Sequence, residues 1–345
     1  MKFTFPILTL CKGGAQRMLA EVTNGLVEQG HEVIILMPPQ GDVEFDIKAK
    51  LIRTKSPMIV ETDYPNSDVI VSNYYLTVPQ AQQASKNGKG VHVRFSLCYE
   101  PAFLPDNHIT FPTYHVTPRI IVLSKWHRDL IKLNHGISGE IVPVGVSSSF
   151  KNLNIRKPDD QLEVSAVIRK VEGGFSWHRE QTYLIQQLEM VKNRYNHIKI
   201  NFFCPPAELA SSSDLQKLKK NGKFRFYTPA DDTELCYHYN QSDIFVNSST
   251  YDTASLPGLE AMRCGAALAT TYAGGNADYC RHEENCLISY RYENKLSEDI
   301  FRLIHNPRLR EKLAKQGEQD AAAWTWTRSV NLFEQAITKL VAISR

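Results

Sequence analysis

Two carboxylates flank a predicted strand-to-helix turn in the stretch SSTYDTASLPGLEAMRCGAA, residues 248–267. Asp252 follows an apolar run, Pro257 suits the first turn of a helix, and Glu260 falls about one turn later. Ser255 lies where a capping residue would stand. Carboxylates accept paired hydrogen bonds from vicinal hydroxyls, and a helix N-terminus attracts a phosphate. The combination predicts a site for a phosphorylated sugar; the alternative is a turn acid and a solvated helix acid.

A second candidate site is the Gly13-Gly14 pair, between the first apolar run and a stretch with Leu19, Val22 and Leu26 on one helical face. Glycines let the backbone approach a ligand, and the N–H groups that begin a helix bind anions. The pattern is neither the G-x-G-x-x-G dinucleotide fingerprint nor a phosphate loop ending in G-K-[ST]. It indicates an anion site or, alternatively, a tight turn with nothing bound.

The elements that must position these residues alternate along the whole chain. Continuous β-branched runs separated by amphipathic stretches are typical of parallel strands covered by helices on both faces. The runs are FTFPILTL, HEVIILMP, DVIVSNYY, VHVRFSLCY, RIIVLS and GEIVPVGV, then VSAVIRK, IKINFFC, FRFYT, DIFVNSS, AALATTY and NCLISY. They predict an α/β fold of two doubly wound, Rossmann-like domains. Ligands bind such sheets beyond the carboxyl ends of the strands, which predicts an interdomain cleft.

A domain boundary is expected in the polar stretch 148–163, which contains Pro158 and no apolar period. We therefore predict an N-terminal domain over residues 1–155 and a C-terminal domain over residues 156–327. A final helix at about 328–345 is expected to pack back on the first domain. The chain has 345 residues, enough for two such cores.

Composition narrows the classes of function. The net charge of +3 does not demand a nucleic-acid partner, and no run approaches the roughly 18 apolar residues that span a bilayer. The N-terminal apolar stretch is interpreted as a buried strand rather than a signal peptide. The seven cysteines lack C-x-x-C spacing, which favours reduced thiols. We predict a cytoplasmic protein that binds no nucleic acid.

The stretch QSDIFVNSSTYDTASLPGLEAMRCGAALATTYAGGNADY resembles the donor-site signature of retaining glycosyltransferases with the GT-B fold, the large bacterial family 4, or glycosyl transferases group 1. That signature is Glu-x7-Glu inside E-G-F-G-L-P-x-L-E-A-M-A-C-G, followed by G-G-x-x-E. KGGAQRMLAEVTNGLVEQGHEV, RIIVLSKWHRDLI, EIVPVGVSSSF and WTWTRSVNLFEQAI are similar to other segments of the family, so the resemblance covers nearly the whole chain. LCYEPAFL also resembles a branch that includes bacterial rhamnosyltransferases. The resemblance implies two Rossmann-like domains facing a cleft.

The resemblance implies a role for each matching residue. Asp252 would bind the hydroxyls of the donor sugar, Glu260 the nucleotide ribose, and Arg169 the diphosphate. The family's companion lysine is absent, and alignment on the following helix places Arg179 there. The implied donor-binding residues are Gly13, Gly14, Arg169, Arg179, Tyr227, Asp252, Ala254, Ser255, Leu256 and Glu260. Asp252 and Arg169 are also the predicted catalytic residues, with Glu100, a loop acid before a proline, as the candidate base on the acceptor side.

Three positions depart from the family pattern. Asp252 is one methylene shorter than the family's glutamate, Asp278 replaces the acid of G-G-x-x-E, and the turn between the two acids reads Thr253-Ala254-Ser255. Shorter acids change which sugar hydroxyls are reached. These departures motivate an alternative function, a GT-B partner protein that has lost catalysis and stabilises an active transferase. A sugar-nucleotide epimerase of similar fold is disfavoured by the closing tryptophan segment.

Several of these side chains have structural alternatives. Arg169 could pair with Glu172 on the surface. Asp231 and Asp232 could suggest a metal pair, but D-D-T-E-L fits a helix cap better, and we expect no metal or cofactor. His92 is a candidate cleft histidine, although a lone histidine in a strand is more often structural.

The function predicted from the sequence is transfer of a sugar, with retention of configuration, from a nucleotide-sugar donor to a glycan or lipid-linked acceptor. Synthesis of bacterial surface polysaccharide or glycoconjugate is implied by the resemblance. The basic run KLKKNGK at residues 217–223 is either a solvated face or a patch that contacts the inner membrane surface.

Overall fold

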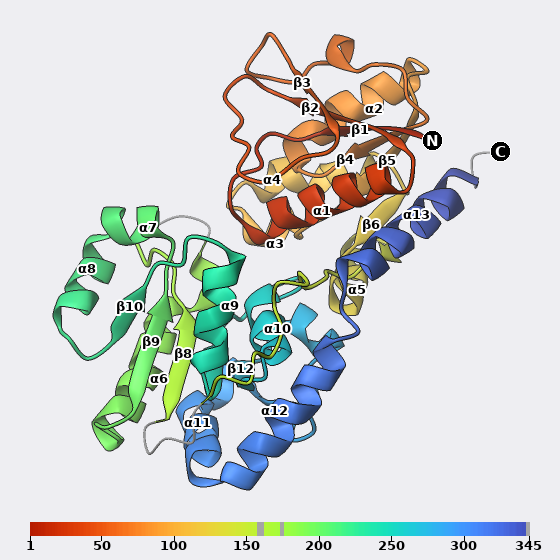
Figure 1. Cartoon of the computed structure of the whole chain (residues 1–345). Coiled ribbons are helices and arrows are strands. Elements are labelled where there is room, and N and C mark those ends of the chain that lie inside the picture. The colour runs from red at the N-terminus through yellow and green to blue at the C-terminus, as the bar shows by residue number, and fades with distance from the viewer. Residues whose placement is uncertain (157–161, 173–175, 343–345) are drawn as a thin grey trace. The chain divides into compact units, whose positions relative to one another are not determined.

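The computed structural model describes residues 1–156, 162–172 and 176–342. The chain forms two compact units, shown in Figure 1: unit 1 comprises Met1–Gly145 and Thr325–Arg345, and unit 2 comprises Val146–Trp324. The chain thus leaves unit 1 after Gly145, rather than after residue 155, and returns to it after Trp324. Pro158, within the expected linker, lies outside the described residues.

Unit 1 is built on a parallel sheet whose described residues form seven strands in the order β3-β2-β1-β4-β5-β6-β7. Their bounds are β1 Lys2–Pro6, β2 Glu32–Met37, β3 Lys50–Arg53, β4 Val69–Ser72, β5 Val91–Phe95, β6 Ile120–Val122 and β7 Glu140–Ile141. Every pairing is parallel, as the apolar runs predict. The strand order reverses between β1 and β4, where a doubly wound sheet opens a crevice at its carboxyl edge.

Helices cover this sheet and complete its core. They are α1 Gly14–Glu28, α2 Val78–Lys86, α3 Glu100–Phe103, α4 Asn107–Thr110, α5 Lys125–His135 and α13 Trp326–Ala342, with 3-10 turns η1 Glu61–Asp63, η2 Tyr75–Thr77 and η3 Phe111–His115. The last helix, α13, packs inside unit 1, where the Phe333 ring lies 5.2 Å from that of Phe95 and 6.1 Å from that of Phe5. Gly25 lets α1 approach α13 closely, because a Cβ there would lie 2.4 Å from a methyl group of Val330.

Unit 2 repeats this architecture with a six-stranded parallel sheet in the order β10-β9-β8-β11-β12-β13 among its described residues. The strands are β8 Glu163–Val167, β9 Lys199–Phe203, β10 Arg225–Tyr227, β11 Ile244–Asn247, β12 Ala267–Thr271 and β13 Leu287–Ser289. The order reverses between β8 and β11. The carboxyl ends of these two strands are therefore the expected place for a ligand in unit 2.

The helices of unit 2 pack on both faces of its sheet. They are α6 Gln181–Arg194, α7 Pro206–Ser211, α8 Ser213–Lys220, α9 Asp232–Gln241, α10 Leu256–Arg263, α11 Leu296–His305 and α12 Pro307–Ala321, with 3-10 turns η4 Trp177–Arg179, η5 Gly275–Asp278 and η6 Arg291–Glu293. Their apolar faces close a core around the central strands, including Leu184, Leu188 and Val191 of α6 and Ile300 and Leu303 of α11.

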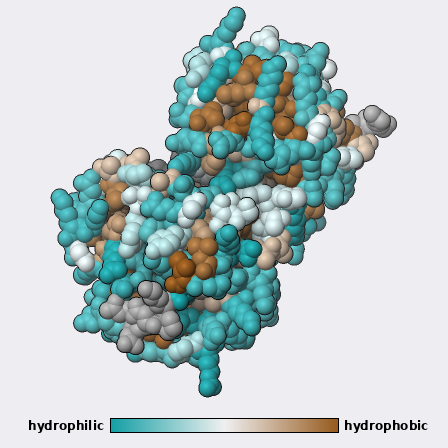
Figure 2. Space-filling model, viewed as in Figure 1, coloured by the Kyte–Doolittle hydropathy of each residue, from teal (hydrophilic) through white to brown (hydrophobic). Residues whose placement is uncertain are grey.

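The composition predicted reduced thiols and no apolar run long enough to span a bilayer, and the structure can be compared with both predictions. Figure 2 shows hydrophilic residues over most of the face in view, interrupted by an apolar area on unit 1. Within the described residues, none of the helices combines the length and hydropathy required to cross a membrane. All seven cysteines are free thiols.

Candidate functional site

The switch point of unit 2 carries the side chains that the sequence singled out. Arg169 follows β8, and Asp252 follows β11, the two strands between which the order of the sheet reverses. Arg179 ends η4, and electrostatic interactions connect its guanidinium to Asp252 and Arg169. Three predicted residues from separate segments of the chain are thus brought together at one carboxyl edge.

Arg169 is held in place by an acid that the sequence did not point to. Its Nε donates to Oε1 of Glu208 at 2.8 Å, and its Nη2 forms an ion pair with the same oxygen. The other oxygen of Glu208 accepts the Lys170 N–H at 2.7 Å. Glu172, the partner considered from the sequence, instead accepts hydrogen bonds from the Ser212 hydroxyl. The Arg169–Glu208 pair fixes the direction of the guanidinium.

Arg179 is a partly buried residue at this edge. Burial lowers its pKa, and the charge of Asp252 counteracts that effect. Its backbone is anchored, because the Ser248 hydroxyl donates to the Arg179 carbonyl at 2.6 Å. Across the described part of the chain, the guanidinium itself makes no hydrogen bond or ion pair of normal geometry. A cation held in this way is suited to bind an anionic ligand.

The loop that carries Asp252 is built against the loop after β12. The Asp252 N–H donates to the Ala273 carbonyl, and the Gly275 N–H donates to the Asp252 carbonyl, each at 2.8 Å. Gly275 is required for this close approach, because a Cβ there would lie 2.1 Å from the Thr253 carbonyl oxygen. The carboxylate is therefore attached to a rigid pair of loops.

Ser255 stands at the N-cap position of α10, as expected, but its side chain does not cap the helix. Its φ of +59° is left-handed, a conformation that costs about 1–3 kcal/mol for a residue other than glycine. Three bonds hold it: Asn247 donates to its hydroxyl, Tyr279 donates to its carbonyl, and its N–H donates to Oδ1 of Asp252 at 2.9 Å. The same oxygen accepts the Ala254 N–H at 3.2 Å. Asp252 therefore organises the turn, in addition to its electrostatic interaction with Arg179.

The first turn of α10 supplies the positive end of a helix to the same region. Leu256 is its first residue, and helix geometry leaves the initial N–H groups without partners inside the helix. Pro257 has no N–H, which limits the number of such donors. Glu260 lies one turn further on, partly buried, and its Oε2 accepts a hydrogen bond of 3.4 Å from the hydroxyl of Tyr239.

Aromatic side chains of β10 and α9 form a series of contacts that reaches Glu260. The ring of Tyr227, at the end of β10, lies 4.4 Å from the ring of His238, which stacks in turn near Phe203. The next residue of α9, Tyr239, contacts Glu260. Tyr227 and Glu260 are therefore connected through α9. Sequence reasoning did not single out Tyr239, because a tyrosine in an amphipathic helix is usually a core residue.

The glycines of unit 1 lie where the sequence placed them, at the start of α1. Gly13 is the N-cap and Gly14 the first helical residue, and no side chain caps the helix. The backbone of Gly13 is extended, a conformation open to any residue, so the site does not require glycine for its φ. The uncapped N–H groups remain suited to an anion. A role for Gly13 and Gly14 in donor binding stays a prediction.

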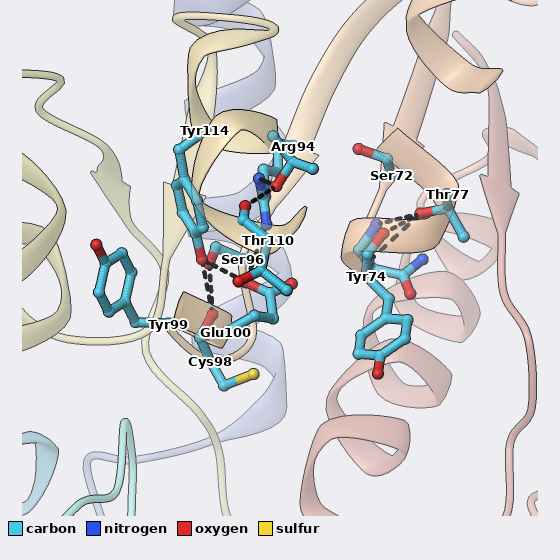
Figure 3. A network of polar contacts seen from close by, with 12 residues as sticks. Ser72, Tyr74, Thr77, Arg94, Ser96, Cys98, Tyr99, Glu100, Thr110 and Tyr114 are labelled. Carbon is cyan, nitrogen blue, oxygen red and sulfur yellow. Dashed lines mark hydrogen bonds and ion pairs between the residues drawn. The ribbon is translucent and has the colours of Figure 1, made fainter. Parts of the chain in front are cut away.

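Glu100 belongs to a buried network in unit 1, shown in Figure 3. Its Oε2 accepts hydrogen bonds from Arg94 at 2.9 Å and from the hydroxyl of Tyr114. Arg94 also donates to the Thr113 hydroxyl at 2.7 Å, and its guanidinium lies 3.6 Å from the centre of the Tyr114 ring. The Arg94 and Glu100 side chains are 0% and 1% exposed. A base must reach a substrate hydroxyl, so this geometry favours a structural role for Glu100 over the predicted catalytic one.

The contacts of His92 favour the structural role over the cleft histidine that the sequence also suggested. It is buried, and its two ring nitrogens contact Ser72 and Gln82, each at 2.7 Å. Burial, with the nearby Arg94 and Arg119, lowers its pKa from 6.5 to about 3. His127 is also fully buried, and burial with the charge of Arg94 lowers its pKa to about 3.

These two histidines predict a loss of stability in mild acid. Both stay neutral when folded, whereas the unfolded chain binds protons below pH 6.5, so their contribution is complete above pH 6.5 and is lost as pH falls towards 3. Each contributes a slope of at most about 1.4 kcal/mol per pH unit. Urea unfolding between pH 7.5 and 5 should show this slope, and His92→Gln should reduce it. An unchanged slope in the variant would contradict the assignment.

The helix cap predicted for the Asp231–Asp232 pair is confirmed, because Asp231 is the N-cap of α9. The Asp231 carboxylate accepts the N–H groups of Thr233 and Glu234, each at 2.9 Å, at the start of α9. Among the residues that the structure describes, no group of three or more histidine, cysteine or acidic side chains is arranged to hold a metal ion.

Two Rossmann-like units with parallel sheets define the fold as GT-B. The family model described as "Glycosyl transferases group 1" matches residues 172–320, which confirms the resemblance in most of unit 2. The matched region includes Arg179, Asp252 and Glu260, and Arg169 lies just before it. No curated protein matches the chain.

Solved structures extend the likeness to both units. Sucrose-phosphate synthase from Thermosynechococcus elongatus superposes with a TM-score of 0.81 at 15% identity, covering 99% of each chain. Anabaena HepE, in complex with UDP-glucose, gives 0.78 at 15% identity and covers 99% of this chain and 100% of its own. WaaG, a glycosyltransferase involved in lipopolysaccharide biosynthesis, gives 0.72 at 14% identity, covering 97% of this chain and 98% of its own. These similarities establish the GT-B fold.

Proposed function

We propose that this protein is a glycosyltransferase that moves a sugar from a nucleotide-sugar donor to a glycan or lipid-linked acceptor. The observation that carries the proposal is the guanidinium of Arg179, which interacts electrostatically with Asp252 and Arg169 near the switch point and has no hydrogen-bond partner among the described residues. The match of residues 172–320 to group 1 glycosyltransferases supports it. So does the UDP-glucose complex of the similarly folded HepE.

The proposed mechanism is stabilisation of the leaving group. Breaking the bond between the sugar and the nucleoside diphosphate develops negative charge on the phosphate oxygens. Arg179 and Arg169 would meet that charge, with the N–H groups at the start of α10, around Leu256. Glu208 would hold Arg169 in the required direction. No side chain is assigned as a covalent nucleophile, and the nucleotide-sugar is a substrate rather than a cofactor.

The acids and aromatic residues of the site would recognise the rest of the donor. Glu260, contacted by Tyr239, would accept hydrogen bonds from the ribose, and Tyr227 would contact the base. Asp252 would bind sugar hydroxyls through Oδ2, because its Oδ1 already accepts the N–H groups of Ala254 and Ser255. The Ala254 and Ser255 N–H groups are therefore already hydrogen-bonded, and we assign them a structural role rather than a ligand-binding one.

Finer features of the function rest on the resemblance. We propose that transfer retains the configuration of a hexosyl donor, without a metal, and serves bacterial surface polysaccharide or glycoconjugate synthesis in the cytoplasm. Peripheral contact with the membrane is proposed through the exposed lysines of α8, Lys217, Lys219 and Lys220. The anomeric configuration of the product, measured by NMR, tests retention.

A thermal-shift screen against a panel of nucleotide sugars tests the proposal directly. A ligand at 100 times its dissociation constant stabilises the folded state by about 2.7 kcal/mol. We expect one donor to raise the melting temperature, Glu260→Ala to abolish that rise, and nucleoside diphosphate to be released when acceptor is added. A chain that binds a donor but never releases nucleoside diphosphate would instead be the non-catalytic partner protein. Stabilisation by none of the nucleotide sugars would contradict the proposed transferase and would leave the non-catalytic partner protein as the remaining function.

A further inference from the structure

Tyr239 of α9 is a buried residue whose hydroxyl reaches the candidate site through Glu260. The residue is 0% exposed, so a ligand does not touch it directly. Its hydroxyl donates to Oε2 of Glu260 at 3.4 Å. Glu260 is only partly buried, about one turn after α10 begins at Leu256. Tyr239 can therefore act on a ligand only by positioning a neighbouring side chain, and Glu260 is the one that its hydroxyl contacts.

The ring of Tyr239 is held in place by other aromatic side chains. Its centroid lies 5.3 Å from that of Phe245 and 5.6 Å from that of Phe203, and both pairs are edge-to-face, at 88° and 80°. The ring of Phe150 lies 5.8 Å away. The backbone is fixed as well, because the Tyr239 carbonyl accepts a hydrogen bond of 3.1 Å from the guanidinium of Arg156. The hydroxyl is therefore a donor with a fixed position.

The hydrogen bond between Tyr239 and Glu260 has a defined direction. Burial raises the pKa of the Tyr239 hydroxyl well above its usual range, and the negative charge of Glu260 acts in the same direction. The hydroxyl therefore stays protonated and donates, while the carboxylate accepts. A long side chain such as glutamate loses rotamer freedom when it binds a ligand, and a contact that orders it beforehand removes part of that cost. The contact therefore prepares Glu260 as an acceptor.

We propose that Tyr239 is a positioning residue that sets the preference of the nucleotide site for ribose over 2′-deoxyribose. The inference rests on the proposed function, in which Glu260 accepts hydrogen bonds from the ribose of the donor. A carboxylate held in place by Tyr239 accepts from both vicinal hydroxyls, whereas 2′-deoxyribose offers one donor fewer. Without the Tyr239 hydroxyl, the carboxylate must be ordered by the ligand itself, so the second hydrogen bond adds less affinity. The preference then depends on a hydroxyl that never touches the nucleotide.

Isothermal titration calorimetry on the full chain tests this inference with UDP, GDP, ADP and CDP, each beside its 2′-deoxy counterpart. We expect one ribonucleotide to bind about tenfold or more tightly than its 2′-deoxy form, because the latter lacks one hydrogen bond to a charged group. Tyr239→Phe keeps the ring and removes the hydroxyl, and it should reduce this ratio to about threefold or less, mainly by weakening the ribonucleotide.

Two further variants support the comparison. Tyr239→Met also lacks the hydroxyl and fills much of the space of the ring, so it gives the same measurement should Tyr239→Phe not fold. The matched control is Tyr237→Phe, two residues earlier on α9, where the tyrosine is 49% exposed. This control should leave the ratio unchanged.

A double-mutant cycle shows whether Tyr239 acts through Glu260. Glu260→Ala alone should remove most of the preference for ribose, and adding Tyr239→Phe should change the ratio no further. A wild-type ratio near one, or a ratio unchanged in Tyr239→Phe, would overturn the inference. So would an equal loss of affinity for both forms of the nucleotide, which is what a tyrosine with a purely structural role predicts.

The same measurements separate this inference from the proposed function. A chain that binds none of the four nucleoside diphosphates would refute the proposed donor site, and the inference with it. A chain that binds one of them and releases it during transfer, but selects ribose equally well without the Tyr239 hydroxyl, would refute the inference alone.

Discussion

Arg179→Ala is expected to lower the rate of sugar transfer by about 10²–10³-fold, the loss found when one group that stabilises developing negative charge is removed. The guanidinium interacts electrostatically with Asp252 and Arg169, but it forms no hydrogen bond with any of the described residues. The substitution should therefore lower the free energy of unfolding only slightly. The measurement is release of nucleoside diphosphate with acceptor present, alongside the melting temperature.

Two further variants make this result specific. Arg179→Lys keeps the charge but loses the planar fork that binds two phosphate oxygens, so its rate should fall between those of the wild type and Arg179→Ala. Arg225→Ala removes an exposed arginine at the opposite, amino end of β10 and should leave the rate unchanged. A folded Arg179→Ala protein with nearly full activity would remove the main support for the proposed site.

Glu100→Gln is expected to destabilise the protein by about 3–5 kcal/mol, the cost of leaving a buried charge without its partner. The change keeps the shape of the side chain, but the guanidinium of Arg94, which is 0% exposed, loses its only ion-pair partner among the described residues. Urea unfolding measures the loss. Glu28→Gln is the control, because its pair with Lys48 is 61% and 57% exposed and contributes about 0–1 kcal/mol.

The same variant separates the two roles of Glu100. If Glu100 were the base that activates an acceptor, Glu100→Gln would lose turnover while its stability stayed close to the wild type. The double change Arg94→Met, Glu100→Leu should recover most of the lost stability, because removing both charges removes the unpaired one. Failure to recover stability would show that the surrounding Tyr114 and Thr113 depend on the ion pair for their positions.

The central strands of both sheets could be predicted from the sequence because they are buried on both faces. A parallel strand covered by helices reads as a continuous apolar run, as β2, β4 and β12 do. Strand β3 was missed because it is an edge strand with mostly exposed side chains, so it carries no such run. Helix α2 was missed because it buries only Val78, Ala81 and Ala84, too small an apolar face for a clear helical period.

The positions of the two acids of the candidate site were also predicted from the sequence, through the spacing of Asp252, Pro257 and Glu260 around one strand-to-helix turn. Local geometry is sufficient here, because a turn of this length fixes both acids relative to the start of the helix. The position of Arg179 was harder to predict, because its alignment crosses a difference in loop length. In the structure, the Ser248 hydroxyl donates to the Arg179 carbonyl and so holds η4 against the loop after β11, where Arg179 interacts electrostatically with Asp252 and Arg169.

Only the tertiary structure decided which acids are functional candidates and which are structural. Glu208 meets Arg169 across 39 positions of the chain, although Glu172 is far nearer in sequence. Glu100 reads as a loop acid, yet the fold of unit 1 places it against Arg94 in the interior. Periodicity records which face of an element is buried, whereas an ion pair depends on which elements meet, and that is settled when the sheets and helices pack.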